Sequence, residues 1–410
     1  MRDIAGLLVC VLLSSACRHE TGVDQEGANQ DPSKARRGRE VRQRVVASVA
    51  DAPVPTGLPL IVREGQDASG HPRSYVDRAG LRSLLHHQRF SELTAYIEQF
   101  QREFEADPKK DRYPTAAIEA FGSAEPELLP QLTAWVKASP SSFAPYAARA
   151  VHYNAVAWAQ RGGEYASKTP KSNFDAMRAT AQLIRTDVET AQKISPKLVE
   201  PDALLIEIAI LTADRPLAQA ALAHSLTICP SCFAVRALYM TVLEPRWGGS
   251  LEEMERFAEI QARAPYPDLK LLAGFADSER ASIAYDKKDY GEALRYSNAA
   301  CARGPHQGFL DQRAQIWGAL KDYEKAEADA DAALELSPVR PALRSTRAWI
   351  RDSRENWEGA AEDLIAGLRV DPTDEKARRL KPHVVEGLNY AGWQAHLKGD
   401  KATALRLLEL

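Results

Sequence analysis

After Tyr75, apolar residues recur along most of the chain at steps of three and four, the spacing that places them on one face of an α-helix. The clearest stripe lies in residues 173–194. Ser172 and Asp175 resemble an N-terminal cap for this segment, and Pro196 follows its end. The apolar positions of the stripe are Phe174, Met177, Ala181, Ile184, Val188 and Ala191.

The same spacing predicts further, mostly shorter helices, with prolines standing between several of them. They are expected over 81–104 (two pieces joined near Gln88), 126–138, 143–161, 201–212, 216–227, 234–243 and 251–264. Proline cannot continue a helix, so Pro140, Pro170, Pro230 and Pro245 are expected to separate them. Short antiparallel helices with brief connections predict an all-α fold of stacked helical hairpins.

The N-terminus carries an export signal rather than a folded element. Ile4–Leu13 is an unbroken apolar stretch of ten residues, which is too short to span a bilayer. Small residues and then Cys17 follow it, and this order resembles a bacterial lipobox, which implies lipidation of Cys17. Because Arg18 rather than Asp follows, the resemblance implies an outer-membrane lipoprotein facing the periplasm. A plain cleaved signal and a cytoplasmic protein with a misplaced start codon are the alternatives.

Residues 18–75 show no helical or strand period and are rich in Gly, Pro, Asp, Gln and Arg. This composition predicts a disordered basic and polar tether. A run of basic residues within it could contact an anionic lipid surface. The run consists of Lys34, Arg36, Arg37, Arg39, Arg42 and Arg44. It contains no aromatic residues and the whole chain has a net charge of −3, so no nucleic-acid partner is expected.

The last third of the chain repeats itself. An aromatic residue is followed at fixed steps by alanine, a second small residue and proline, and the anchor alanines are 33 and 34 residues apart. The three units are Tyr290, Ala293, Ala300 and Pro305; Tyr323, Ala326, Ala333 and Pro338; and Trp357, Ala360, Gly367 and Pro372. Period and pattern resemble the tetratricopeptide repeat, which implies a right-handed solenoid. A fourth, incomplete unit contains Gly392 and Ala404.

In tetratricopeptide repeats the first helix of each hairpin lines the concave face, so the resemblance implies a binding groove for a peptide or protein. The positions that it places there are Ser278, Ser282, Tyr285, Asp311, Gln315, Ser345, Trp349, Asp352, Asn389, Trp393 and His396. Trp349 and Trp393 are equivalent in successive units. They would form two aromatic shelves of the kind that dominates interface hot spots, or would pack between the repeats.

Two signatures mark the middle of the chain. One is Ala157–Gly163 (AWAQRGG) and the other is Pro245–Ser250 (PRWGGS). Together they resemble an uncharacterised bacterial family known only as a domain of unknown function, which implies no activity. Trp158, Arg161, Arg246 and Trp247 would be core anchors and caps. Alternatively, they would form one ligand corner, in which Arg grips an anion and Trp stacks on a small molecule.

Cys229-Pro-Ser-Cys232 is the one motif with possible covalent chemistry, since no phosphate loop, HExxH or GxSxG occurs. Two half-buried cysteines or a small structural disulfide between Cys229 and Cys232 is one interpretation. Redox activity is a second, and a metal site recruiting His224 is a third that lacks a fourth ligand. No catalysis, metal or cofactor is therefore expected.

The patterns divide the chain into four parts: a lipoprotein-type signal (1–17), the tether (18–75), a helical-hairpin domain (76–265) and the repeats (266–410), of which the last is incomplete. They favour a membrane-tethered scaffold that binds a protein or peptide. A small-molecule or anion site at the Trp–Arg–Gly corners is the alternative.

Overall fold

The structure of the protein, a computed structural model, describes residues 52–67, 70–163 and 166–409. The predicted signal, Cys17 and the basic run lie outside the described residues. Within them the expected all-α fold is confirmed, because eighteen α-helices accompany a single pair of two-residue strands. None of these helices is long and apolar enough to cross a membrane.

The chain begins with β1 (Leu60–Ile61), which pairs antiparallel with β2 (Tyr75–Val76). Ten helices follow: α3 (Arg78–His86), α4 (Phe90–Ala106), α5 (Arg112–Glu119), α6 (Leu128–Ala138), α7 (Ala144–Arg161), α8 (Lys171–Ile194), α9 (Glu200–Thr212), α10 (Arg215–Ile228), α11 (Phe233–Val242) and α12 (Leu251–Gln261). Short 3₁₀ turns lie at η2 (Pro108–Lys110), η3 (Ala166–Lys168), η4 (Pro245–Trp247) and η5 (Pro267–Leu272).

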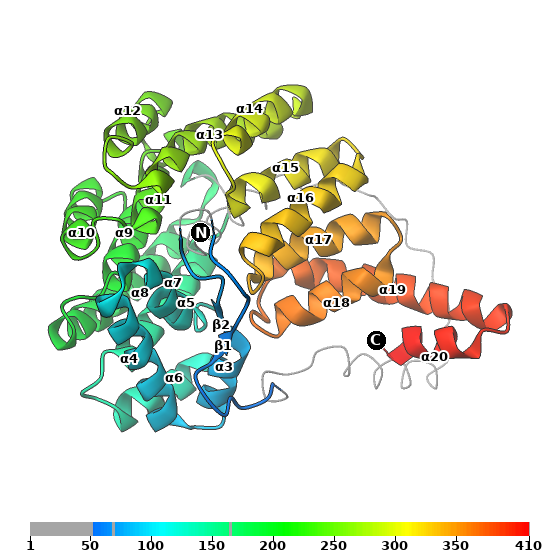
Figure 1. The fold of residues 1–410 in the computed structure, drawn as a ribbon, viewed down its shortest axis with the longest axis horizontal. Coiled ribbons are helices and arrows are strands. Elements are labelled where there is room, and N and C mark those ends of the chain that lie inside the picture. Colours follow the sequence, from blue (N-terminus) through cyan, green and yellow to red (C-terminus); the bar gives the residue numbers. More distant parts are fainter. Residues whose placement is uncertain (1–51, 68–69, 164–165, 410) are drawn as a thin grey trace.

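Four regular hairpins complete the chain. They are α13 (Ala273–Asp286) with α14 (Tyr290–Ala302), α15 (Gln307–Ala319) with α16 (Tyr323–Leu336), α17 (Pro341–Ser353) with α18 (Trp357–Leu368), and α19 (Glu375–Leu397) with α20 (Lys401–Glu409). They follow one another in order away from the middle domain (Figure 1).

The turn within each of these hairpins has the same construction. A residue with positive φ ends the first helix, as Lys321 does at 63°. The next residue then accepts a hydrogen bond from the backbone of the second helix, as Asp322 does from the Lys325 N–H at 3.3 Å. Asp289, Asn356 and Asp400 cap the other three second helices in the same way. This reversal plus cap fixes where each helix stops and the next begins.

The middle domain contains a further hairpin of this type. At α9–α10, Ala213 has a φ of 58° and Asp214 caps α10 through the Leu217 N–H. Counted from Asp214, the exposed Pro230 and the fully buried Ala218 stand at the same offsets as Pro305 and Ala293 counted from Asp289. The sequence pattern did not reveal this unit, because Arg215 replaces the aromatic residue that follows the cap.

One expectation is corrected, because the segment predicted to be the end of a disordered tether is folded over residues 52–67 and 70–75. Proline prevents them from forming a helix, but they run as an extended segment beside α3. Ala52 is buried and its carbonyl accepts a hydrogen bond from Ser83 Oγ at 2.8 Å. The segment lies between the middle domain and the repeats in Figure 1.

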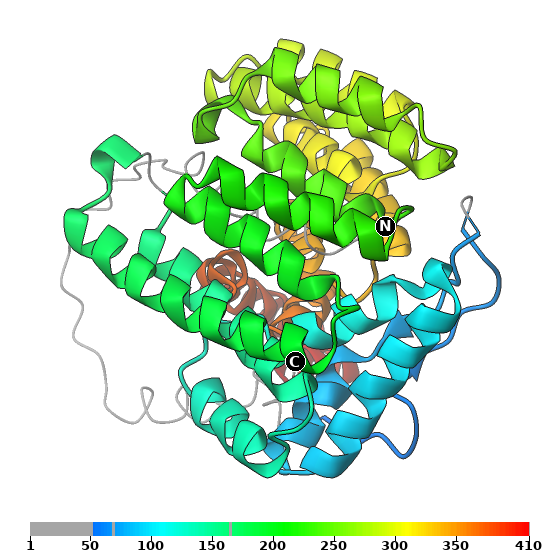
Figure 2. The ribbon, with the colours of Figure 1, turned by 90° about the vertical axis from the view of Figure 1, so that its left-hand side faces the viewer.

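The repeats curve back onto the first helices of the middle domain (Figures 1 and 2). Arg82 donates to the Val370 carbonyl at 2.9 Å, and Ser123 Oγ donates to Asp371 at 2.9 Å. Tyr75 donates to the Glu335 carbonyl at 3.2 Å. One large core extends from Val76 to Ala276, while the repeats carry smaller clusters between neighbouring hairpins. The solenoid is thus closed by contacts between parts far apart in sequence.

Candidate functional site

The first signature, AWAQRGG, is the C-terminal end of α7. Trp158 is buried, and its indole N–H donates to Glu207 of α9 at 2.8 Å. Arg161 is also buried, and it donates to Thr169 Oγ1 at 2.8 Å and to the Gly162 carbonyl at 3.3 Å. Gly162 ends the helix with a φ of 70°, a conformation that favours glycine. Every residue of this set therefore has a structural task.

The second signature, PRWGGS, forms η4 and the start of α12. Gly248 has a φ of 87°. A Cβ atom on Gly249 would lie 2.2 Å from the Leu243 carbonyl oxygen, so only glycine fits. Ser250 then caps α12 by accepting from the Glu253 N–H at 3.2 Å. The motif is thus a tight reversal between α11 and α12.

The two signatures meet in space. The rings of Trp158 and Trp247 are 5.7 Å apart in an edge-to-face arrangement. Trp247 in turn has two guanidinium groups near its ring, Arg246 at 5.1 Å and Arg161 at 6.0 Å. Phe174 of α8 adds a further ring 5.2 Å from Arg161. The four residues predicted for a ligand corner are therefore neighbours, which the sequence could not establish.

Buried carboxyl groups surround this corner. Burial raises the pKa of Glu207 to about 8, so its side chain is largely protonated at neutral pH. Burial also raises the pKa of Glu244 well above its usual range, and the neighbouring Glu279 adds to that shift. The pKa of Glu279 is likewise raised by burial, while the positive charge of Arg246 opposes the increase.

Groups of the protein itself face both guanidinium groups of the corner. Arg246 interacts electrostatically with Glu244, Glu279 and Asp286, and Arg161 is engaged by Thr169. Burial lowers the pKa of Arg161, and the like charge of Arg246 lowers it further. The arrangement joins α7, α9, α11 and α13 into one unit. The convergence that a ligand site requires is present, but both guanidinium groups already face protein partners.

The candidate groove residues differ in how deeply they are buried. Gln315 and Asp352 are buried, and both bond to neighbouring polar groups: Gln315 to Asp311 at 2.9 Å and Asp352 to His383 at 2.8 Å. Tyr285 is half-buried and its ring lies 5.3 Å from that of Tyr290. The Asp352–His383 and Tyr285–Tyr290 contacts connect two helices each, whereas the Gln315–Asp311 bond lies within α15. Asn389 is exposed on α19.

The two equivalent tryptophans occupy different environments. Trp349 is half-buried, and it lies so close to α15 that a Cβ atom on Gly318 would be 2.3 Å from its ring. Lys376 lies 5.7 Å from the centre of the same ring. Trp393, in contrast, is 58% exposed. Its only ring contact within the described residues is His396, at 5.8 Å. The two do not form a matched pair of shelves.

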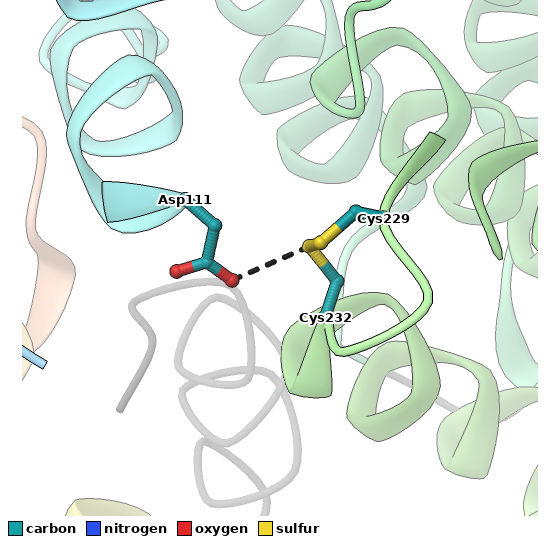
Figure 3. Close-up of side chains that lie close together, drawn as sticks. All are labelled: Asp111, Cys229 and Cys232. Atoms are coloured by element: carbon teal, nitrogen blue, oxygen red, sulfur yellow. Dashed lines mark hydrogen bonds between the residues drawn. A yellow bond between two sulfur atoms is a disulfide. The ribbon is translucent and has the colours of Figure 1, made fainter. Parts of the chain in front are cut away.

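The CPSC motif connects α10 to α11, where Cys229 and Cys232 form a disulfide with Cα atoms 5.3 Å apart. Both sulfur-bearing residues are buried. Asp111, which precedes α5, points a carboxylate oxygen at the Cys232 sulfur at 3.3 Å (Figure 3). His224, named as a potential metal ligand from the sequence, instead bonds to Asp202 at 2.9 Å.

The last hairpin exposes several large apolar residues, of which sequence analysis singled out Trp393 alone. Eleven large apolar residues are exposed in the described part of the chain, and five of them lie in α19 and α20. They are Tyr390 (58%), Trp393 (58%), Leu397 (62%), Leu405 (60%) and Leu408 (49%). An exposed apolar cluster of this kind marks an interaction site more often than a scattered apolar residue does.

Comparison with known proteins agrees with this description. A family model described as a domain of unknown function (DUF4034) matches residues 77–214 and 218–264, which correspond to the expected middle domain. No curated protein matches the chain significantly.

Solved structures of helical repeat proteins are similar over part of the chain. Pseudomonas aeruginosa PilF is 14% identical, over 50% of this chain and 90% of that one, with a TM-score of 0.30. PilW, a type IV pilus biogenesis factor, is 17% identical to this chain. The match covers 50% of this chain and 94% of PilW, with a TM-score of 0.30. The P58(IPK) TPR domain is 13% identical to this chain. The match covers 75% of this chain and 96% of that domain, also with a TM-score of 0.30. In its described residues the chain is an all-α protein of stacked helical hairpins, and its middle region matches a family of unknown function.

Proposed function

We propose that the chain is a non-catalytic protein-interaction scaffold, and that α20 binds an amphipathic helix of a partner protein. One observation carries this proposal. Counted from the caps Asn356 and Asp400, Leu405 and Leu408 of α20 are equivalent to Ala361 and Leu364 of α18. We call Leu405 and Leu408 the α20 face.

In the preceding hairpin these positions are covered. Ala361 and Leu364 are only 2% and 3% exposed, because they pack with Val384 and Leu388 of the following helix, α19. In a stack of hairpins, each second helix is built to receive the first helix of the next unit. The α20 face has the apolar character of such a joint, and Leu405 and Leu408 are 60% and 49% exposed in the described structure.

The occupant that fits is therefore a helix with its own apolar stripe. Apolar anchors at steps of three and four on the partner would cover Leu405 and Leu408, in the manner of helix-in-groove recognition. Arg406 and Glu409 flank the α20 face and are exposed, so polar residues of the partner would surround the apolar contact.

The test is photo-crosslinking in cells that produce the protein. A photoreactive phenylalanine analogue replaces Leu405, and in a matched control it replaces Ala328, an exposed residue on α16. We expect position 405 to crosslink to one segment of another protein that has an amphipathic helical pattern, and position 328 not to do so. Crosslinking only to a second copy of the chain, or equal crosslinking from both positions, would overturn the proposal.

We also propose that the scaffold is held at a membrane by a lipid on Cys17. The apolar stretch Ile4–Leu13 and the small residues before Cys17 support this, and Arg18 favours the outer membrane. Fractionation of the wild type and a Cys17→Ala variant tests it. The wild type should enter the detergent-soluble membrane fraction and the variant should leave it, whereas a wild type that stays in the soluble cytoplasmic fraction would contradict the tether.

A further inference from the structure

The CPSC loop is held rigidly by the side chain behind it. Arg236 of α11 is buried and donates to the carbonyl of Cys232 at 2.7 Å and to that of Pro230 at 2.8 Å. The Cys232 N–H donates to the Cys229 carbonyl at 3.1 Å. These bonds keep the two cysteines close together whether or not their sulfur atoms are joined.

The third member of the cluster is Asp111, which comes from a distant part of the sequence. One ligand atom from each of Asp111, Cys229 and Cys232 lies within 4.8 Å of the other two. In the described residues, this is the one group of three or more such side chains with that spacing. All three residues are buried, so the cluster is enclosed by protein.

The contact between Asp111 and Cys232 has a chemical meaning that depends on the redox state. A thiol can donate its proton to a carboxylate, but the sulfur of a disulfide has no proton to donate. The 3.3 Å contact is therefore a hydrogen bond only in the dithiol. Asp111 thus contributes a favourable interaction to the reduced form that the oxidised form does not have.

We propose that the reduced cluster is a Zn²⁺ site, with the thiolates of Cys229 and Cys232 and a carboxylate oxygen of Asp111 as ligands. Two thiolates and a carboxylate are donors that Zn²⁺ accepts, and a Cys-x-x-Cys spacing is common in zinc sites. A water molecule completes the four positions. Metal binding and the disulfide exclude each other, so the redox state of the cysteines controls occupancy.

The change in geometry is small. Tetrahedral coordination with Zn–S distances of about 2.3 Å places the two sulfur atoms roughly 3.7 Å apart. Rotation of the two side chains achieves this, because the Cα atoms are already 5.3 Å apart. Pro230 is exposed and Ser231 is half-exposed, so the loop that carries the two cysteines lies at the protein surface.

The reaction balances with a dithiol or phosphine as reductant. A dithiol gives two electrons and two protons to the disulfide, which becomes two thiols while the dithiol becomes a disulfide itself. Zn²⁺ then displaces both thiol protons into solution, because only thiolates bind it. In the reverse direction, an oxidising disulfide takes two electrons from the thiolates of Cys229 and Cys232 and two protons from solution, and becomes two thiols. The two cysteine sulfur atoms then form their own disulfide and Zn²⁺ leaves.

The behaviour of the surrounding groups agrees with this site. His71 lies behind Asp111, with its Nδ1 atom 2.7 Å from the Lys109 carbonyl and 3.9 Å from Asp111. The guanidinium of Arg236, close to the loop, offsets the net negative charge of a Zn²⁺ ion with three anionic ligands.

Cobalt titration of the full chain tests the site. The protein is reduced with a phosphine, the reductant is removed without oxygen, and Co²⁺ is added. We expect one Co²⁺ per chain, with the near-ultraviolet charge-transfer absorption of thiolate-bound cobalt, and displacement by Zn²⁺. The oxidised protein should show none of this absorption, and adding a disulfide oxidant to the loaded protein should release the metal to a chromophoric chelator.

Three variants make the assignment specific. Cys232→Ser should abolish the charge-transfer absorption, and Asp111→Asn should weaken Co²⁺ binding at least tenfold. Cys301→Ser, which removes a half-buried thiol elsewhere, should change nothing. X-ray absorption of the zinc-loaded wild type should give two sulfur ligands, and it does not depend on how well a variant folds. Two free thiols at Cys229 and Cys232 without cobalt absorption, or absorption lost in Cys301→Ser, would overturn the proposal.

Discussion

Replacing Glu207 by glutamine should remove a large part of the pH dependence of stability. Glu207 is buried on α9, it accepts the indole N–H of Trp158, and its pKa is raised to about 8 by burial. Glutamine keeps an oxygen that can accept the same hydrogen bond, but it does not ionise. The variant therefore isolates the effect of the charge.

The unfolding free energy falls with rising pH because the folded state retains a proton on Glu207 that the unfolded chain loses. In the unfolded chain this carboxyl titrates near its ordinary value of 4.5, whereas in the folded protein it titrates near 8. Stability from Glu207 is thus fully present below pH 4.5 and is lost as the pH rises through 8. The shift corresponds to at most about 5 kcal/mol of unfolding free energy, at about 1.4 kcal/mol per pH unit.

Urea unfolding, followed by tryptophan fluorescence at several pH values, measures this effect. We expect the unfolding free energy of the wild type, relative to Glu207→Gln, to fall by several kcal/mol between pH 5 and pH 9. Glu362→Gln, which changes an exposed carboxylate on α18, is the control and should follow the wild type. Parallel curves for the wild type and Glu207→Gln would refute the inference that Glu207 is protonated in the folded protein.

Three further predictions concern the repeats and are checked by thermal or urea unfolding. Ala326→Leu should destabilise the protein by about 1–3 kcal/mol, because Ala326 is fully buried between hairpins. Ala328→Leu, on the exposed side of α16, should have little effect. Equal losses would mean that the helix faces are assigned wrongly. Gly318→Ala should cost a similar 1–3 kcal/mol, since its Cβ would meet the Trp349 ring, and a neutral change would show that the ring moves freely. Trp349→Ala should lower the free energy of unfolding by about 2 kcal/mol and Trp393→Ala by less than about 0.5 kcal/mol, because Trp349 is half-buried and Trp393 is exposed. A larger loss for Trp393→Ala would contradict its exposed position.

The repeats could be predicted from the sequence because their contacts are local. Ala293, Ala326 and Ala360 recur at a fixed period, and each is fully buried where two helices approach closely. The same local reasoning located Gln88 as the turn between α3 and α4, where its φ is 55°. Contacts within a hairpin leave a regular trace in the sequence.

The candidate sites depend on contacts between distant segments, which leave no such trace. Arg161 and Arg246 are far apart in the chain, and only the packing of α7 against α9 and of α9 against α11 brings their surroundings together. Asp111 reaches Cys232 across an even longer separation. For Glu207 a signal did exist, since it is the lone acidic residue within the apolar run of residues 204–211, and such a residue is expected to be buried with a partner.

Trp349 and Trp393 show a second limit. The repeat alignment makes them equivalent, but their environments depend on the neighbouring helix. Gly318 makes room for the ring of Trp349, whereas Trp393 stays exposed on α19. For the same reason, sequence analysis could not distinguish the covered Ala361 and its exposed counterpart Leu405.

The α20 face is the recognition surface that we propose, and an affinity measurement tests this proposal. The segment that crosslinks to position 405 is synthesised as a peptide and titrated into the full chain by calorimetry. We expect saturable binding with a gain of peptide helicity. The affinity should be at least tenfold weaker for Leu408→Ser and unchanged for Ala328→Ser. Equal affinity for the wild type and Leu408→Ser would contradict it.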